Sequence, residues 1–212
     1  MVINFLGDSI TQGAGAACEA DMYVNVVGAT LGCEVKNYGV GGTRIARQTT
    51  PSVEPIYDQD FLLRSEQMGD ADLVFVFGGT NDFGHGAADF GELDSTDICT
   101  FCGAVNTLLG NLIARYGKEK LCVILPLHRS DEKNPYGDGS KAKPGKLLSE
   151  YVLAIKTIAD KYGLDTMEFD EEFPFSKTEP CHGLTTDGLH PNSVGHKIIA
   201  DKICEYVRKK CS

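Results

Sequence analysis

Short apolar runs alternate along the chain with longer segments in which apolar residues recur at helical spacing. Five runs predict β-strands, at residues 2–6, 34–38, 73–77, 121–125 and 166–169. The third and fourth are almost entirely apolar, which is typical of strands covered on both faces of a parallel sheet. The pattern therefore predicts a mainly parallel, five-stranded sheet.

Five segments between and after these runs predict helices, at residues 22–31, 59–67, 97–116, 146–162 and 193–210. The last segment places apolar residues three and four positions apart on one helix face: Val194, Ile198, Ile199, Ile203 and Val207. Asn192 or Ser193 is suited to cap the start of this helix. The alternation of strands and helices predicts an α/β fold, a three-layer sandwich with helices on both faces of the sheet.

Composition and charge restrict the function classes. The 212 residues predict a single domain, 1–212. The formal net charge of −10 repels phosphate backbones, so nucleic acid is excluded as a partner. No apolar run reaches the 18 residues of a membrane-spanning helix. The first residues lack the basic region of a secretory signal, which favours a cytoplasmic protein over a secreted form whose leader has been removed.

The cysteine and histidine positions predict neither a metal site nor a cofactor. Cysteines such as Cys122 and Cys204 lie inside apolar stretches, so we interpret all eight as free thiols. Cys99 and Cys102 have CxxC spacing, but no second pair accompanies them. The histidines are scattered, the glycine-rich turn at Gly7 lacks the lysine of a P-loop, and no G-x-G-x-x-G follows a strand.

Open α/β sheets place their sites at the carboxyl ends of the strands. Three turns rich in glycine and polar residues follow the first three predicted strands, at residues 7–13, 39–43 and 78–82. A fourth segment, 187–192, precedes the last predicted helix. We expect these four segments to carry the chemistry.

Together they supply the parts of a nucleophilic acyl-transfer site, which needs a hydroxyl, a base, a group that orients the base and donors to an oxyanion. Ser9 lies on a glycine-flanked turn from strand to helix, and Asp187 precedes His190 by three residues. Asn81 offers a side-chain amide at the end of a strand. Each segment taken alone is also explained by helix capping or an Asx turn.

In this order the segments resemble the SGNH hydrolase superfamily of GDSL-like lipases and acylhydrolases. The matching blocks span nearly the whole chain: Gly7-Asp-Ser-Ile, Asn37-Tyr-Gly-Val-Gly-Gly42, Gly78-Gly-Thr-Asn-Asp82 and Asp187-Gly-Leu-His190. The resemblance implies a flavodoxin-like sheet, in agreement with the strands and helices predicted above.

The resemblance also implies roles for individual residues. Ser9 would be the nucleophile, His190 the base and Asp187 its partner. The oxyanion hole would consist of the Ser9 N–H, the Gly42 N–H and the Asn81 side chain. Gly41 is adjacent to Gly42, and the spacing from Asn37 favours Gly42. We assign Asp8 a structural role, the bonding of turn amides, rather than a catalytic one.

The substrate is inferred from the loops that should surround Ser9. Residues 128–146 form a long predicted loop with five positive and three negative side chains. Arg44, Phe83, His128 and Arg129 are the predicted substrate rim. This polar rim favours a small-acyl ester, such as an acetylated saccharide or another small polar molecule. A lysophospholipase or thioesterase is the alternative enzyme, and a catalytically silent ligand-binding module is the alternative of another class.

Overall fold

The computed structural model describes residues 1–52, 54–174 and 183–211. In this part of the chain, five parallel strands form one sheet in the order β2-β1-β3-β4-β5. The strands are β1 (Val2–Gly7), β2 (Glu34–Gly39), β3 (Leu73–Phe77), β4 (Leu121–Ile124) and β5 (Asp165–Met167). The prediction of a mainly parallel five-stranded sheet is confirmed.

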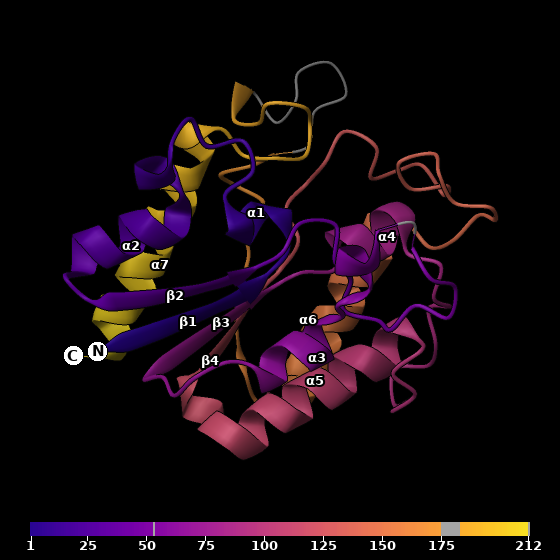
Figure 1. Cartoon of the computed structure of the whole chain (residues 1–212), viewed down its shortest axis with the longest axis horizontal. Helices are drawn as coiled ribbons and strands as arrows, with labels where there is room; N and C mark the ends of the chain where they lie inside the picture. Colours follow the sequence, from indigo (N-terminus) through magenta and orange to yellow (C-terminus); the bar gives the residue numbers. More distant parts are fainter. Residues whose placement is uncertain (53, 175–182, 212) are drawn as a thin grey trace.

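Helices cover both faces of the sheet, which gives three layers (Figure 1). On one face lie α2 (Tyr23–Leu31) and α7 (Ser193–Lys210), and on the other lie α3 (Phe61–Glu66), α5 (Phe101–Tyr116) and α6 (Leu148–Tyr162). All five are among the predicted helices. The shorter elements are α1 (Ser9–Gln12), α4 (Thr80–His85), η1 (Glu19–Asp21), η2 (Pro55–Asp58) and η3 (Lys118–Lys120).

Two predicted boundaries differ from the structure for local reasons. The helix predicted from residue 97 begins at Phe101, because the Thr100 side chain caps it by accepting from the Gly103 N–H. The segment after β3, where the sequence predicts a turn at residues 78–82, instead enters the helix α4 at Thr80. Phe83 is the only large apolar residue of α4, so no apolar period could reveal this helix.

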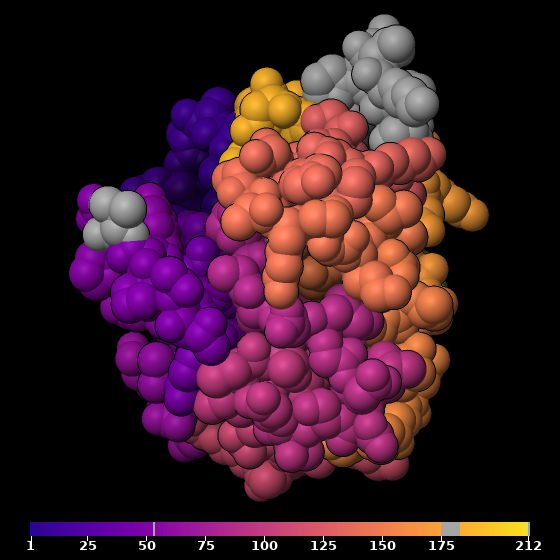
Figure 2. Space-filling view, turned by 90° about the vertical axis from the view of Figure 1, so that its right-hand side faces the viewer, coloured from indigo at the N-terminus to yellow at the C-terminus, as the bar shows by residue number. Residues whose placement is uncertain are grey.

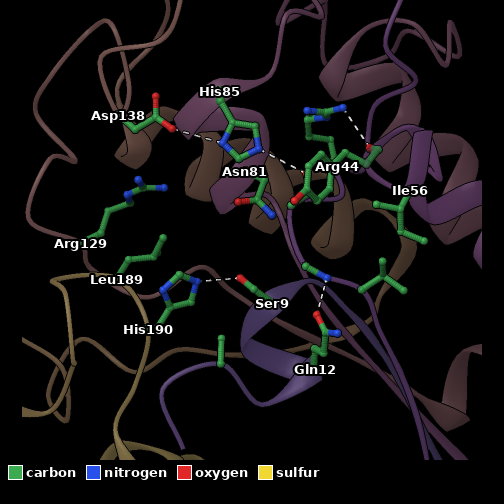
Figure 3. Close-up of a pocket in the computed structure, with 15 residues that line it drawn as sticks. Ser9, Gln12, Arg44, Ile56, Asn81, His85, Arg129, Asp138, Leu189 and His190 are labelled. Atoms are coloured by element: carbon green, nitrogen blue, oxygen red, sulfur yellow. Dashed lines mark hydrogen bonds and ion pairs between the residues drawn. The ribbon is translucent and has the colours of Figure 1, made fainter. Parts of the chain in front are cut away.

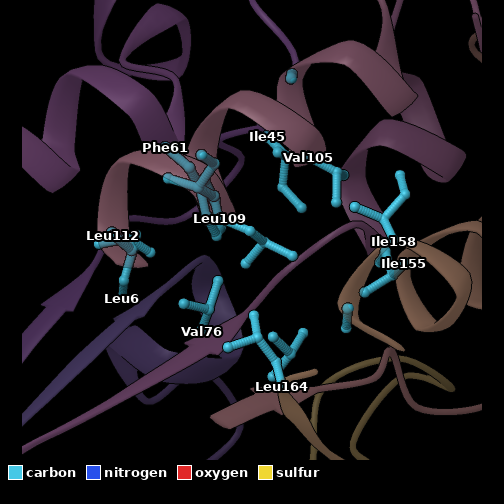
Figure 4. Close-up of a cluster of buried hydrophobic side chains, with 14 of the residues drawn as sticks. Leu6, Ile45, Phe61, Val76, Val105, Leu109, Leu112, Ile155, Ile158 and Leu164 are labelled. Atoms are coloured by element: carbon cyan, nitrogen blue, oxygen red, sulfur yellow. The ribbon is translucent and has the colours of Figure 1, made fainter. Parts of the chain in front are cut away.

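Alternate side chains of the central strands enter two separate cores. Leu6 and Val76 face α3, α5 and α6, where they pack among residues such as Leu109 (Figure 4). Phe5 and Phe75 face α2 and α7, and their rings are stacked with 5.3 Å between centroids. The sheet is therefore buried on both faces, as the apolar sequences of β1 and β3 indicate.

The strand order places the candidate site. β1 lies between β2 and β3, so the chain leaves β1 toward one side and later returns to its other side. In open α/β sheets a crevice forms at such a switch point, beyond the carboxyl ends of the strands. Ser9 follows β1 and Asn81 follows β3, so the topology brings both residues to this crevice.

An irregular segment, residues 125–147, connects β4 to α6 and confirms the predicted long loop. In Figure 2 this segment (coral to orange) covers the upper part of the visible face, above the magenta residues that follow β3. The Asp138 N–H donates to the carbonyl of Gly84, in α4, over 3.0 Å. The loop is thus attached to α4 beside the crevice.

Two further sequence interpretations concern cysteines and membranes. The seven cysteines in the described ranges are free thiols, whereas Cys181 lies outside the described residues. Within those same ranges, none of the helices combines the length and the apolar character needed to cross a membrane.

Candidate active site

The turn after β1 presents Ser9 at the start of α1. Asp8 caps this helix, and its Oδ1 accepts from the Ile10 N–H over 3.0 Å. Burial raises the pKa of Asp8 to about 6. At Gly7 a Cβ atom would collide with the Thr11 side chain, so only glycine allows the turn to close this tightly. Asp8 thus has the turn-stiffening contacts expected from the sequence.

Ser9, His190 and Asp187 form a line of hydrogen bonds. The Ser9 Oγ lies 2.9 Å from His190 Nε2, and His190 Nδ1 lies 2.7 Å from Asp187 Oδ2 (Figure 3 shows the first contact). Burial raises the pKa of Asp187, but hydrogen bonds from His190 outweigh it and hold that pKa below its ordinary value. The ionised carboxylate only accepts, so Nδ1 carries a proton and the Nε2 lone pair faces the Ser9 hydroxyl.

The loop that carries His190 is stabilised by its own residues. Asp187 Oδ1 accepts from the backbone N–H groups of Leu189 and His190, over 3.0 and 2.8 Å. The Thr186 N–H donates to the His190 carbonyl, and Asn192 caps α7 by accepting from Val194 and Gly195. His190 is therefore positioned by short-range contacts immediately before a long helix.

The segment after β2 exposes one backbone donor beside Ser9. The Gly41 N–H donates to Gln12 Oε1 over 2.7 Å. For the Gly42 N–H, no hydrogen-bond acceptor occurs among the described residues. Gly42 has a φ of 74°, and the Tyr57 ring occupies the space that a Cβ would need. Of the two adjacent glycines, Gly42 therefore has the N–H that is open to a ligand.

Side chains of α4 hold this segment against the end of β3. Asn81 Nδ2 donates one proton to the Thr43 carbonyl over 3.0 Å, which leaves its second proton for another acceptor. Asp82 accepts from the N–H groups of Ile45 and Ala46, over 2.9 Å each. Burial raises the pKa of Asp82 to about 6. The donors at Gly42 and Asn81 thus belong to one connected unit.

Ser9, Gly42, Asn81 and His190 line a common pocket of about 720 Å³, a size typical of small-molecule sites (Figure 3). The apolar part of its wall consists of Ala14, Val40, Ile56, Tyr57 and Leu189. The other polar residues of the wall are Gln12, Arg44, His85, Arg129 and Asp138.

Two of the four predicted rim residues line this pocket, but their charges are already paired. Arg44 donates to Ser52 Oγ, to the Tyr57 carbonyl and to Asp58. Arg129 binds Asp131 through two nitrogens and Thr80 through a third. The arginines therefore make the wall polar without making it strongly positive.

The prediction of Phe83 and His128 as rim residues is wrong. Phe83 is fully buried and packs its ring against Tyr151, because α4 turns this position away from the face that carries Asn81. His128 lies outside the pocket of Ser9 and contacts Glu132 Oε2 through Nδ1 over 2.6 Å.

Other pocket residues were not identified from the sequence. Gln12 lies three residues after Ser9 in α1, and His85 lies four residues after Asn81 in α4. These spacings place each pair on one helix face, so recognition of the two short helices would have revealed both residues. Asp138 lies in the irregular loop, where no periodic signal exists.

The described residues contain no group of three or more side chains arranged to hold a metal ion. The Cys99-x-x-Cys102 pair straddles the start of α5, with Cys99 before the helix and Cys102 buried within it. Burial raises the pKa of Cys102 to about 11, which keeps it a thiol near neutral pH.

Comparison with protein families confirms the resemblance in the sequence blocks. The model of the GDSL-like Lipase/Acylhydrolase family matches residues 5–198. This chain belongs to that family. It is therefore a member of a family of hydrolytic esterases and acylhydrolases, and the expected enzyme class is confirmed.

Solved structures share the fold across nearly the whole chain. A protein of Lactobacillus plantarum is 26% identical, with a TM-score of 0.79 and coverage of 98% of this chain and 96% of its own. An acetyl xylan esterase, AlAXEase, is 24% identical, with a TM-score of 0.65 and coverage of 98% and 100%. A carbohydrate acetylesterase family member from Sinorhizobium meliloti is 17% identical, with a TM-score of 0.64 and coverage of 99% and 98%. No curated protein matches the chain.

Proposed function

We propose that this protein is a serine esterase that removes a small acyl group, acetyl above all, from a saccharide or another small polar alcohol. The observation that carries the proposal is the hydrogen-bonded line from Ser9 through His190 to Asp187, beside the open donors of Gly42 and Asn81. This arrangement supports the roles of nucleophile, base and oxyanion donors for residues that line one pocket, with Asp187 bonded to the base as its orienting group.

In the acylation step, Ser9 Oγ forms a bond to the ester carbonyl carbon, and His190 Nε2 takes the hydroxyl proton. The carbonyl oxygen becomes an oxyanion that the N–H groups of Ser9 and Gly42 and the amide of Asn81 stabilise. The carbon–oxygen bond to the alcohol then breaks. His190 gives its proton to the departing oxygen, which leaves acyl-Ser9.

In the deacylation step, His190 takes a proton from a water molecule as the water oxygen bonds to the acyl carbon. The second tetrahedral intermediate uses the same donors. It collapses to the free carboxylic acid, and the proton returns from His190 to Ser9. Asp187 stabilises the imidazolium in both steps and keeps Nε2 directed at Ser9.

The lining of the pocket supports a small acyl group on a polar alcohol. Besides Ser9, Gly42, Asn81 and His190, the wall contains five polar residues. Its apolar part is formed by five residues from several segments of the chain. Two proteins that share this fold are named for acetyl xylan and carbohydrate esters. Their likeness agrees with an acetylated saccharide as substrate.

One observation favours the alternative of a lysophospholipase or thioesterase. Ile56 and Tyr57 line the pocket and are 45% and 41% exposed, so they offer apolar surface to a longer chain. A comparison of acetylated sugars, lysolipids and acyl-CoA esters, each at equal concentration, distinguishes the small-acyl esterase from the lysophospholipase and the thioesterase. We expect the highest kcat/KM with the acetylated sugars.

Release of p-nitrophenol from p-nitrophenyl acetate tests the proposed mechanism. We expect a burst of product equal to the enzyme concentration, because acyl-Ser9 accumulates, and complete inhibition by a serine-directed phosphonate. Mass spectrometry should locate the phosphonate on Ser9. A silent binding module would show neither turnover nor labelling, and that result would overturn the proposal.

A further inference from the structure

A second histidine lies in the wall of the Ser9 pocket, opposite His190 (Figure 3). His85, the last residue of α4, places Nε2 at 3.3 Å from the Gly42 carbonyl oxygen and Nδ1 at 3.3 Å from Asp138 Oδ2. Its side chain is 30% exposed. The ring therefore bridges the segment after β2 and the irregular loop between β4 and α6.

Both partners of this ring are acceptors, because a carbonyl and an ionised carboxylate have no proton to donate. Burial raises the pKa of Asp138, but hydrogen bonds from Ser140, together with the neighbouring His85, hold it below its ordinary value. His85 thus satisfies both contacts only when both ring nitrogens carry protons. Burial, together with the nearby Arg44, holds the pKa of His85 below its ordinary value, although Gly42 and Asp138 act in the opposite direction. A neutral ring that carries its proton on Nε2 still donates to the Gly42 carbonyl.

The Gly42 carbonyl belongs to a residue that lines the pocket and whose N–H has no acceptor among the described residues. Gly42 has a φ of 74° and lies in a segment without regular secondary structure, so contacts of its neighbours determine where its N–H points. Gln12 binds the preceding residue and Asn81 the following one. His85 provides the contact to Gly42 itself.

We propose that His85 is a positioning residue of the oxyanion hole: its ring holds Gly42 by the carbonyl, and Asp138 holds the ring. This inference rests on the proposed function, because it concerns a donor to the same oxyanion. His85 acts through Gly42 and does not itself exchange a proton with the substrate. Its loss should weaken the transition state more than the ground state.

The first test compares His85→Phe and His85→Gln in the hydrolysis of p-nitrophenyl acetate. We expect His85→Phe to lower kcat about 10-fold with KM within about 2-fold, because small displacements of a catalytic donor slow the reaction strongly. Glutamine retains an N–H donor, so His85→Gln should recover most of the lost kcat. Equal kcat in His85→Phe and wild-type protein, or a raised KM with unchanged kcat, would overturn the proposal.

A tetrahedral ligand gives a second readout. Phenylboronic acid forms an oxygen–boron bond with Ser9, while His190 takes the hydroxyl proton, and one boronate oxygen occupies the oxyanion position. We expect its Kd to rise about 10-fold in His85→Phe, in parallel with the loss of kcat. An unchanged Kd would show that His85 does not position the hole.

His128→Phe is the matched control. His128 is also 30% exposed and also contacts a carboxylate, Glu132, but it lies outside the pocket. We expect His128→Phe to retain wild-type kcat, KM and boronate affinity. An equal loss in both variants would mean that a histidine–carboxylate pair matters only for folding, and it would overturn the proposal.

Asp138 supplies variants on an irregular loop, which remain informative if His85→Phe does not fold. Asp138→Leu removes the acceptor of the ring and should lower kcat several-fold. Asp138→Asn should lower kcat less, because its amide can donate to Nδ1 of a neutral ring whose Nε2 proton still reaches Gly42. Equal effects of the two variants would contradict the proposed support. If wild-type protein hydrolyses no ester at all, the proposed function itself fails.

Discussion

The two sides of the pocket are held in different ways. The side with Asp187 and His190 is partly exposed, with 52% and 24% of the two side chains accessible, and the bonds of Asp187 join it to residues close in sequence. The side with Gly42 and Asn81 is held by α4, through bonds between residues 36 to 43 positions apart. Asn81 is only 3% exposed.

This difference agrees with the chemistry proposed for each side. Oxyanion donors must be in place before charge develops, so a rigid, buried scaffold benefits them. A base has to move a proton between several oxygens, and a short self-stabilised loop suffices to orient it. We call the side with Gly42 and Asn81 the oxyanion side and the side with Asp187 and His190 the base side. Changes on the oxyanion side should therefore affect catalysis and folding together, whereas changes on the base side should affect mainly catalysis.

Removal of the nucleophile, which both sides serve, should have the largest effect. We expect Ser9→Ala to lower kcat by about 10⁶, with the fold retained, because among the described residues the hydroxyl makes a single hydrogen bond, to His190. Turnover of p-nitrophenyl acetate and circular dichroism measure the two quantities. Turnover near the wild-type value would mean that another group is the nucleophile.

A comparison of His190→Ala with Asp187→Ala separates the proposed roles of the two residues on the base side. We expect His190→Ala to lower kcat by about 10⁶ and Asp187→Ala by about 10⁴ or less, because the base transfers the proton and the half-exposed carboxylate only orients it. Neither variant should lower the Tm by more than a few degrees. A larger loss of kcat in Asp187→Ala would show that the two roles have been exchanged.

Asn81→Ala tests the coupling of catalysis and folding on the oxyanion side. Loss of one oxyanion donor should lower kcat by about 10² to 10³ with a smaller change in KM. The same variant loses the bond to the Thr43 carbonyl, so unfolding should become easier by about 1 kcal/mol. A raised KM with constant kcat would instead make Asn81 a substrate-binding residue.

Asp82 gives the oxyanion side a pH-dependent stability. Its pKa of about 6 in the folded protein exceeds the ordinary value of 3.8, so the fold favours the protonated carboxyl. The contribution of Asp82 to the free energy of unfolding should therefore fall as the pH rises from about 4 to about 6. By linkage this contribution is about 3 kcal/mol.

Urea unfolding of wild-type protein and Asp82→Asn at about pH 4 and about pH 7 measures this contribution. We expect a smaller decrease in the variant. Part of the decrease should persist, because buried Asp8 has a pKa of about 6 as well. Identical decreases in the two proteins would exclude Asp82 as a source of the pH dependence.

The length of the acyl group should produce the smallest effect, measured as the change in kcat/KM for each added methylene. The apolar wall of the pocket is limited to Ala14, Val40, Ile56, Tyr57 and Leu189, whereas each fully buried methylene of the acyl group would contribute about 0.8 kcal/mol, or roughly 4-fold in kcat/KM. On p-nitrophenyl esters we expect the highest kcat/KM at acetate or propionate and a decline from butyrate onward. A maximum at octanoate would reject the small-acyl substrate and favour the lysophospholipase.

The sequence predicted those elements whose pattern is strong within a short window. The apolar runs of β3 and β4 and the periodic face of α7 indicated their structures directly, and Asn192 proved to be the cap of α7. The four glycine-rich and polar blocks identified Ser9, Gly42, Asn81, Asp187 and His190. Four of them, Ser9, Gly42, Asn81 and His190, line one pocket in the structure, and Asp187 contacts His190.

Tertiary contacts determined the features for which no short stretch of the sequence carries a signal. The six residues of α4 show no apolar period, yet their helical form buries Phe83 and turns His85 into the pocket. The local excess of positive charge around Arg129 does not persist as a positive rim, because Asp131 neutralises the guanidinium.

The sequence by itself therefore determined the order of the layers and the chemistry of the principal groups, because both depend on residue type and near-neighbour spacing. The tertiary structure alone decided which polar side chains are already paired and which residues form the rest of the wall. These features depend on hydrogen bonds between segments such as Gln12 with Gly41 and His85 with Gly42. Only the folded sheet, with its switch point at β1, brings those segments within bonding distance.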